Sequence, residues 1–246
     1  YTQKLKKNNK MNLKKLTFLI LILNFIMDNN YSQDINIAGG GNLQDWANLN
    51  KYQKNNKELK EIIEPNRVVF MGNSITEGWS FFNKKFFIEN PFVNRGISGQ
   101  TTPQMLIRFK SDVVNLSPKS VVILAGINDI AGNTGPISIE NSAENIISMA
   151  EIALANNISV FICSTLPALD FPWSPGLNPA SKVIKLNKIL KDYCKKNNLK
   201  YVDYYSFMSD ENGGLKVPEY TSADDLVHPN KAGYNVMEKI ILKALK

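Results

Sequence analysis

Short apolar runs alternate with longer amphipathic segments along residues 67–246. Five apolar runs have the length and composition of strands, and they cover residues 67–71, 92–94, 120–124, 159–163 and 201–202. Helical periodicity predicts helices over residues 102–113, 137–156, 180–197 and 231–245. Strands that are apolar throughout are typical of parallel sheets covered on both faces. The pattern therefore predicts an α/β fold, a three-layer sandwich with a central, mostly parallel five-stranded sheet flanked by helices.

Two further features concern helices: a start signal for the helix at 102–113 and an additional helix ahead of the first strand. Thr102-Pro103 offers an N-cap followed by proline at the first helical position. Ahead of the first strand, apolar residues recur at helical spacing and predict an amphipathic leading helix; they are Trp46, Leu49, Tyr52, Leu59, Ile62 and Ile63.

The N-terminal 32 residues resemble a targeting segment. Met11 opens a short basic stretch, and a mostly apolar run follows from Leu16 to Met27. That run is shorter than the roughly 20 residues of a membrane span and suits the core of a signal peptide. We expect cleavage near Ser32–Gln33, a secreted or periplasmic protein and no stable membrane span. A buried helix or an uncleaved anchor is the alternative.

The positive charge is concentrated in the same segment. Residues 1–32 carry six lysines and one aspartate, a net +5 of the chain's +7. The remaining residues are nearly neutral and show no basic stripe, so we expect no nucleic-acid partner.

Four polar turns stand out in the globular part, at residues 72–78, 94–101, 125–129 and 224–230, and the first three contain glycine. In open parallel sheets, ligands bind beyond the carboxyl ends of the strands. The first three turns follow predicted strands, and the fourth precedes the last helix. We therefore expect them to form one site.

His228 is the only histidine in 246 residues, so any imidazole acid–base chemistry must use it. Asp225 lies three residues earlier, where a short turn would let its carboxylate bond the ring. Ser74 follows a buried strand through a glycine turn, which would expose a nucleophile at the edge of the sheet. Gly99 and Asn128 are candidate donors to an oxyanion through a backbone N–H and a side-chain amide.

Together these turns resemble the sequence blocks of the SGNH hydrolases, also called GDSL-like esterases and lipases. Gly72-Asn73-Ser74 is similar to the Gly-Asp-Ser block, residues 94–99 to the glycine block, residues 126–129 to the Gly-x-Asn-Asp block and residues 225–228 to the Asp-x-x-His block. The resemblance begins near residue 67 and implies a flavodoxin-like SGNH fold. Asn73 departs from it, because aspartate is usual there.

The resemblance implies a role for each residue. Ser74 is the nucleophile, His228 the base and Asp225 the residue that orients the base. The backbone N–H groups of Ser74 and Gly99 and the side chain of Asn128 form the oxyanion hole. Asp224 is a rival for Asp225, although its spacing to the histidine does not match.

The resulting hypothesis is a serine ester hydrolase that cleaves short-chain acyl esters, acetyl above all, through an acyl-enzyme, with esters of carbohydrates among its candidate substrates. A lipase or thioesterase, or a non-catalytic carbohydrate-binding module on the same fold, is the alternative. Neither a cofactor nor a metal site is expected. The segment 166–176 is expected to wall the pocket, and three nearby carboxylates are expected to be structural: Glu77, Asp129 and Asp170.

We expect three parts in the chain: upstream residues and signal peptide at 1–32, a linker and leading helix at 33–64, and the SGNH-hydrolase domain at 65–246. Cys163 and Cys194 have no metal-ligand spacing and are expected to be buried free thiols. The oligomeric state and the natural ester substrate stay open.

Overall fold

A computed structural model of the chain describes residues 44–246. The predicted signal peptide and its cleavage site lie outside the described residues. Among residues 44–246, no helix has the length and apolar character needed to cross a bilayer.

The centre of the fold is a five-stranded sheet. Its strands are β1 (Val68–Gly72), β2 (Phe92–Gly96), β3 (Ser120–Leu124), β4 (Ser159–Cys163) and β5 (Lys200–Val202), in the spatial order β2-β1-β3-β4-β5. Every neighbouring pair is parallel, with Val68 beside both Phe92 and Ser120. The structure thus confirms the predicted fold class and shows the sheet to be wholly parallel.

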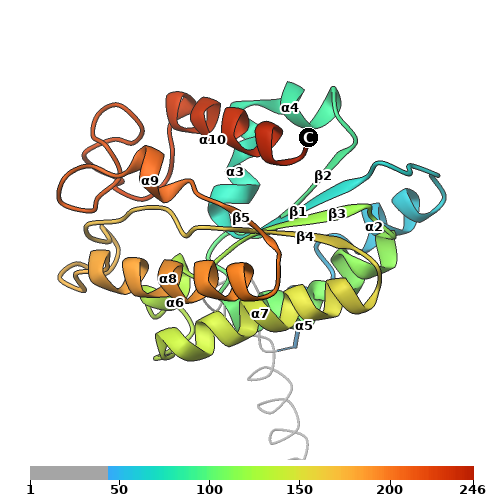
Figure 1. Cartoon of the computed structure of the whole chain (residues 1–246), viewed down its shortest axis with the longest axis horizontal. Coiled ribbons are helices and arrows are strands. Elements are labelled where there is room, and N and C mark those ends of the chain that lie inside the picture. The colour runs from blue at the N-terminus through green and yellow to red at the C-terminus, as the bar shows by residue number, and fades with distance from the viewer. Residues whose placement is uncertain (1–43) are drawn as a thin grey trace, which may run out of the picture. The chain divides into compact units, whose positions relative to one another are not determined.

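Helices cover both faces of the sheet (Figure 1). On one side lie α3 (Ser74–Phe82), α4 (Lys84–Ile88) and α10 (Lys231–Ala244). On the other lie α5 (Thr102–Asp112), α7 (Ile139–Ala155) and α8 (Ala180–Lys196). Shorter elements complete the chain: α2 (Gln53–Lys60), the 3₁₀ helix η1 (Val114–Leu116), α6 (Ile127–Ile130) and α9 (Tyr205–Met208). The result is the predicted three-layer arrangement.

The core on the α3 side is rich in aromatic rings. Phe70 of β1 meets Trp79 of α3 and Phe86 of α4 edge-on, with both ring-centroid distances at 5.7 Å. Trp79 and Phe86 stack at 5.0 Å. Burial of such large rings stabilises the fold strongly and fixes α3 against β1, the strand that leads into it.

The leading helix is shorter than its apolar pattern predicts. It spans only Gln53–Lys60, and Ile62 and Ile63 beyond it are exposed. The periodicity of residues 46–63 therefore predicts a longer helix than the structure has. Ile62 and Ile63 fit the helical pattern, but they lie beyond the helix, in the segment before β1, and face solvent.

Candidate active site

Ser74 is the first residue of α3 and follows β1 after a single residue. Two glycines allow this tight connection. A Cβ on Gly96, at the end of β2, would lie 2.1 Å from the backbone N of Glu77 in α3, and a Cβ on Gly72 would lie 1.9 Å from Thr76 Oγ1. Only glycine fits at either position, so the sequence brings the first turn of α3 directly against the ends of two strands.

His228 connects Ser74 to Asp225. Its Nε2 lies 2.9 Å from Ser74 Oγ, and its Nδ1 lies 2.8 Å from Asp225 Oδ1 and 3.1 Å from Oδ2. The three side chains are half-buried, so solvent and substrate reach them. The structure therefore brings the three predicted residues into one hydrogen-bonded chain.

The Asp225–His228 turn holds the carboxylate in place. Asp225 Oδ1 accepts hydrogen bonds from the backbone N–H of Val227 (3.2 Å) and of His228 (2.8 Å). Leu226 adopts a left-handed φ of 64°, which closes the turn. Among the described residues, the carboxylate that bonds His228 is that of Asp225, whereas Asp224 is exposed.

The predicted oxyanion donors lie around one hollow and come from α6, from the loop after β2 and from the start of α3. Asn128 is the second residue of α6. This helix begins directly after Gly126, whose φ of 104° turns the chain away from β3. The buried Nδ2 of Asn128 donates to the carbonyl of Gln100 at 2.9 Å, which orients the amide. Gly99 has a φ of 75°, and its carbonyl accepts from Asn133 Nδ2 at 3.1 Å. The N–H of Ser74 opens α3, where a helix presents free donors and a partial positive charge.

The two carboxylates nearest the site hold loops in position. Glu77 accepts from the backbone N–H of Ser98 at 2.7 Å and also binds the Ser98 hydroxyl and Lys51. Burial raises the pKa of Glu77, but the hydrogen bonds from Lys51 and Ser98 outweigh it, so this pKa lies below its usual value. Glu77 thereby fixes the peptide next to Gly99.

Asp129 caps α5. Its carboxylate accepts from the N–H of Thr102 (3.0 and 3.1 Å) and from its hydroxyl (2.6 Å). Burial raises the pKa of Asp129 to about 6 despite these bonds. The prediction of Thr102 as N-cap was wrong by one residue, since Thr101 is the N-cap and Asp129 satisfies the N–H of Thr102.

Arg108 of α5 lies beneath the site and is fully buried. Its guanidinium donates to the side chain of Gln100 (2.6 Å), to Asp112 (2.9 Å) and to the carbonyl of Gly72 (2.8 Å). Arg108 thus connects Gly72, at the end of β1, with Gln100, whose carbonyl orients Asn128. Sequence reasoning missed this role, although a charge on an apolar helix face, with an acid four residues later, was a usable signal.

A hollow of about 350 Å³ opens over these groups. Its walls are Ser74, Ser98, Gly99, Asn128, Asn133, Trp173 and His228. Trp173 belongs to the segment 166–176 that was expected to form a wall, whereas Phe171 of that segment is buried in the core. Asn133 was not predicted, although it follows Asn128 in the same turn.

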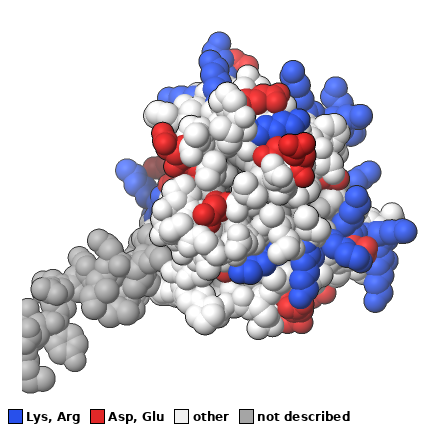
Figure 2. Space-filling view, turned by 90° about the vertical axis from the view of Figure 1, so that its left-hand side faces the viewer, with Lys and Arg blue, Asp and Glu red and all other residues white. Residues whose placement is uncertain are grey.

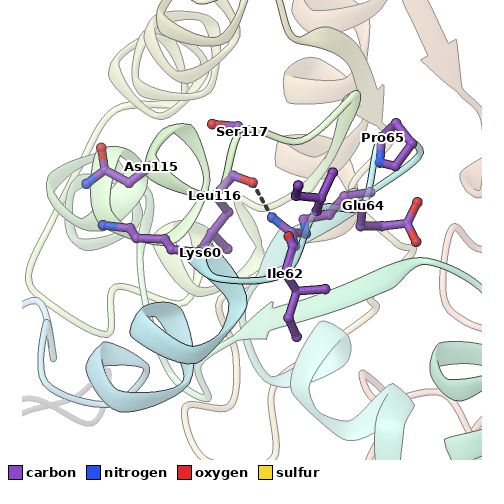
Figure 3. Close-up of a pocket in the computed structure, with 9 residues that line it drawn as sticks. Lys60, Ile62, Glu64, Pro65, Asn115, Leu116 and Ser117 are labelled. Atoms are coloured by element: carbon purple, nitrogen blue, oxygen red, sulfur yellow. Dashed lines mark hydrogen bonds between the residues drawn. The ribbon is translucent and has the colours of Figure 1, made fainter.

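A second hollow, of about 290 Å³, lies among the residues that precede β1 and β3 (Figure 3). Parallel strands start at this edge, so it is opposite to the edge that carries Ser74. Arg67 in its wall donates to the carbonyls of Leu59, Ile62 and Leu116 and closes local loops. We therefore interpret this hollow as a space between loops that Arg67 holds together, and not as part of the site around Ser74.

Asn73 is almost completely buried, and neither of its side-chain polar atoms has a hydrogen-bond partner within the described residues. A carboxylate without a partner would cost more free energy to bury than an amide. The neutral side chain therefore suits this position.

Both cysteines are free and buried, and burial raises the pKa of Cys194 to about 11 and that of Cys163 further. Neither thiol contributes to the hollow.

Such an arrangement can perform acyl transfer to a serine hydroxyl, with a histidine to move the proton. Comparison with known proteins agrees. Residues 70–236 match the model of the GDSL-like lipase/acylhydrolase family. The chain belongs to this family, and it is accordingly a carboxylic ester hydrolase.

Solved structures of two Bacteroides proteins are similar over nearly their whole length. A Bacteroides fragilis protein described as an acylhydrolase is 49% identical, with a TM-score of 0.77 and coverage of 82% of this chain and 97% of that one. A GDSL-like lipase from Bacteroides thetaiotaomicron is 45% identical, with a TM-score of 0.76 and coverage of 81% and 97%. The uncharacterized lipoprotein YqeF of Bacillus subtilis is 26% identical over 156 residues, which is 56% of this chain and 64% of that protein.

Proposed function

We propose that this protein hydrolyses esters of short acyl groups, acetyl above all, through an acyl-enzyme on Ser74. The observation that carries the proposal is the continuous chain Asp225–His228–Ser74, with contacts of 2.8 and 2.9 Å, at the floor of an open hollow. The family membership supports the class of reaction.

In the first half of the reaction Ser74 Oγ attacks the ester carbonyl while His228 Nε2 accepts the hydroxyl proton. The negative charge on the former carbonyl oxygen is stabilised by the N–H groups of Ser74 and Gly99 and by Asn128 Nδ2. The bond to the alcohol oxygen then breaks, and His228 returns the proton to the leaving alkoxide.

In the second half water attacks the acyl-serine carbonyl, and His228 accepts a proton from that water. The bond to Ser74 breaks, the serine recovers its proton and the carboxylic acid leaves. Asp225 keeps the imidazole in the tautomer that presents Nε2 to the serine and stabilises the imidazolium between these steps.

Two features support a short acyl group. The hollow is small, about 350 Å³, and three polar side chains lie in its wall: Ser98, Asn128 and Asn133. A long acyl chain needs an extended apolar surface to leave water favourably. Among the described residues that line the hollow, Trp173 is the one with a large apolar side chain.

The test is a series of p-nitrophenyl esters from acetate to palmitate, assayed with wild type, Ser74→Ala and Ser206→Ala. The control serine also bonds a side chain, Asp203 at 2.9 Å, but lies outside the hollow. We expect kcat/KM to fall steeply beyond butyrate, Ser74→Ala to be inactive and Ser206→Ala to match wild type. Equal or rising kcat/KM toward palmitate would contradict the short-acyl proposal.

We further infer that the enzyme is exported. The basic start at Met11 and the apolar run to Met27 support this, as does the likeness to a Bacillus subtilis lipoprotein. Expression from Met11 in a bacterial host should give protein outside the cytoplasm that starts near Gln33. Cytoplasmic protein that retains Met11 would contradict the inference.

A further inference from the structure

Trp173 lies on a hydrogen-bonded loop that leaves its indole partly open to solvent. Phe171, two residues earlier, is fully buried, and its ring lies 5.2 Å from the indole. Two hydrogen bonds of 2.9 Å brace the loop, from Ser174 N to the carbonyl of Phe171 and from Gly176 N to Asp170. Yet the indole itself is 47% exposed. A large aromatic ring that is held firmly but left open contributes less to the core than a buried one and is available to a ligand.

The indole lies next to the histidine. Its ring centroid is 6.1 Å from that of His228, and the two rings are tilted by 38°. Both rings line the hollow above Ser74, and its other walls include the oxyanion candidates Gly99 and Asn128. The hollow therefore has an imidazole–indole side and an amide side.

The proposed reaction gives these sides different occupants. The leaving alkoxide must take its proton from His228 Nε2, so the alcohol oxygen lies within hydrogen-bond reach of that atom. The carbonyl oxygen lies at the amide side, because the developing charge is stabilised there. The alcohol portion of the ester consequently extends along the imidazole toward Trp173.

Resting on the hydrolytic function proposed above, we propose that Trp173 forms the binding site for the alcohol portion and that this alcohol is a sugar ring stacked on the indole. A flat, half-exposed indole fits the C–H face of a pyranose. An alkyl alcohol would instead require an enclosed apolar groove.

Charge argues against an anionic alcohol such as a phosphorylated one. Figure 2 views the molecule from the side where the strands end, and its charged groups are of both signs, with Lys and Arg mainly toward the margins. The described residues that line the hollow include no Lys or Arg. A neutral polyhydroxylated ring matches this surface.

The experiment compares three acetate esters: a monoacetylated methyl glucopyranoside, glycerol monoacetate and p-nitrophenyl acetate. Glycerol supplies hydroxyls without a ring face, and nitrophenol supplies a ring without hydroxyls. The variants are Trp173→Ala, Trp173→Phe and, as control, Phe207→Ala, which removes another exposed aromatic ring that lies outside the hollow.

We expect Trp173→Ala to lower kcat/KM for the pyranoside ester by at least about fivefold, the effect of losing one aromatic contact. The loss for glycerol monoacetate should stay below about twofold, and that for p-nitrophenyl acetate should be smaller than for the sugar ester. Trp173→Phe should recover most of the activity, and Phe207→Ala should match wild type. Equal losses on all three esters, or no loss on the sugar ester, would overturn the proposal.

Two further measurements separate this inference from the function on which it rests. All three esters give the same acetyl-enzyme, so any effect of Trp173→Ala on its breakdown by water should be equal for the three esters, whereas the effect on acetyl-enzyme formation should be largest for the sugar ester. Ser74 of the wild-type enzyme should react with a fluorophosphonate. If wild type does not react with the fluorophosphonate, the proposed function itself fails. If wild type reacts but kcat/KM for the sugar ester does not depend on Trp173, only the sugar-binding inference fails.

Discussion

Replacement of Arg108 by methionine is a demanding test of the scaffold beneath the site. Arg108 and Asp112 are essentially inaccessible to solvent and lie 2.9 Å apart. At this distance Coulomb's law with an effective dielectric constant of about 20 gives an attraction of about 6 kcal/mol, most of which offsets the desolvation of the two ions. The net value of the pair is therefore small, but either charge alone is costly.

Arg108→Met leaves Asp112 buried with Asn56 Nδ2, at 2.6 Å, as its principal remaining partner. We expect the free energy of unfolding to fall by about 3–5 kcal/mol. Arg108→Met/Asp112→Leu removes both charges, so it should be destabilised by about 1–3 kcal/mol less than the single variant. Urea unfolding at pH 7, followed by circular dichroism, measures both values. A loss below about 1 kcal/mol for the single variant, or a double variant less stable than the single one, would refute this reasoning.

Three further predictions concern the site. Asn128→Ala should lower kcat by about 10²–10³ with little change in KM, because the amide acts on charge that develops in the transition state; steady-state kinetics on p-nitrophenyl acetate checks it, and a pure KM effect would count against it. Asp225→Ala should reduce kcat/KM far more than Asp224→Ala in the same assay, because Asp225 contacts His228; the reverse order would show a misassigned partner. Asp129→Asn should gain about 2.4 kcal/mol in free energy of unfolding relative to wild type as pH rises from 4 to 7. The raised pKa of Asp129 gives wild type a stability that is full below the unfolded pKa and is lost as pH rises through about 6; parallel pH profiles would contradict this.

Much of the fold follows from local pattern. The strands β1, β3 and β4 are apolar runs buried almost throughout, and their predicted limits agree with the structure to within one residue. Residues buried on both faces leave little choice of composition, so the pattern is strong. Helix α3 was not predicted, because Ser74–Phe82 mixes polar and aromatic residues, and residues 72–78 were interpreted as a turn.

The predicted site residues could be selected because sheet topology limits where they can meet. A single histidine and three turns after parallel strands left few combinations, and the structure brings Ser74, Asp225 and His228 into contact. Contacts such as Gln100 to Asn128 and Arg108 to Gly72 join loops and elements that lie 28 and 36 residues apart. No local pattern encodes such pairs, so they become visible only in the folded chain.

The most direct test of the account is to identify the acylated residue. Wild-type enzyme is mixed with excess p-nitrophenyl acetate and quenched in acid within the first turnover, and its peptides are analysed by mass spectrometry. The account predicts one acetyl group, on Ser74, that is absent from Ser74→Ala and accumulates in step with an initial burst of nitrophenol. An acetyl group on a different residue, or turnover by Ser74→Ala at more than about a tenth of the wild-type rate, would contradict it.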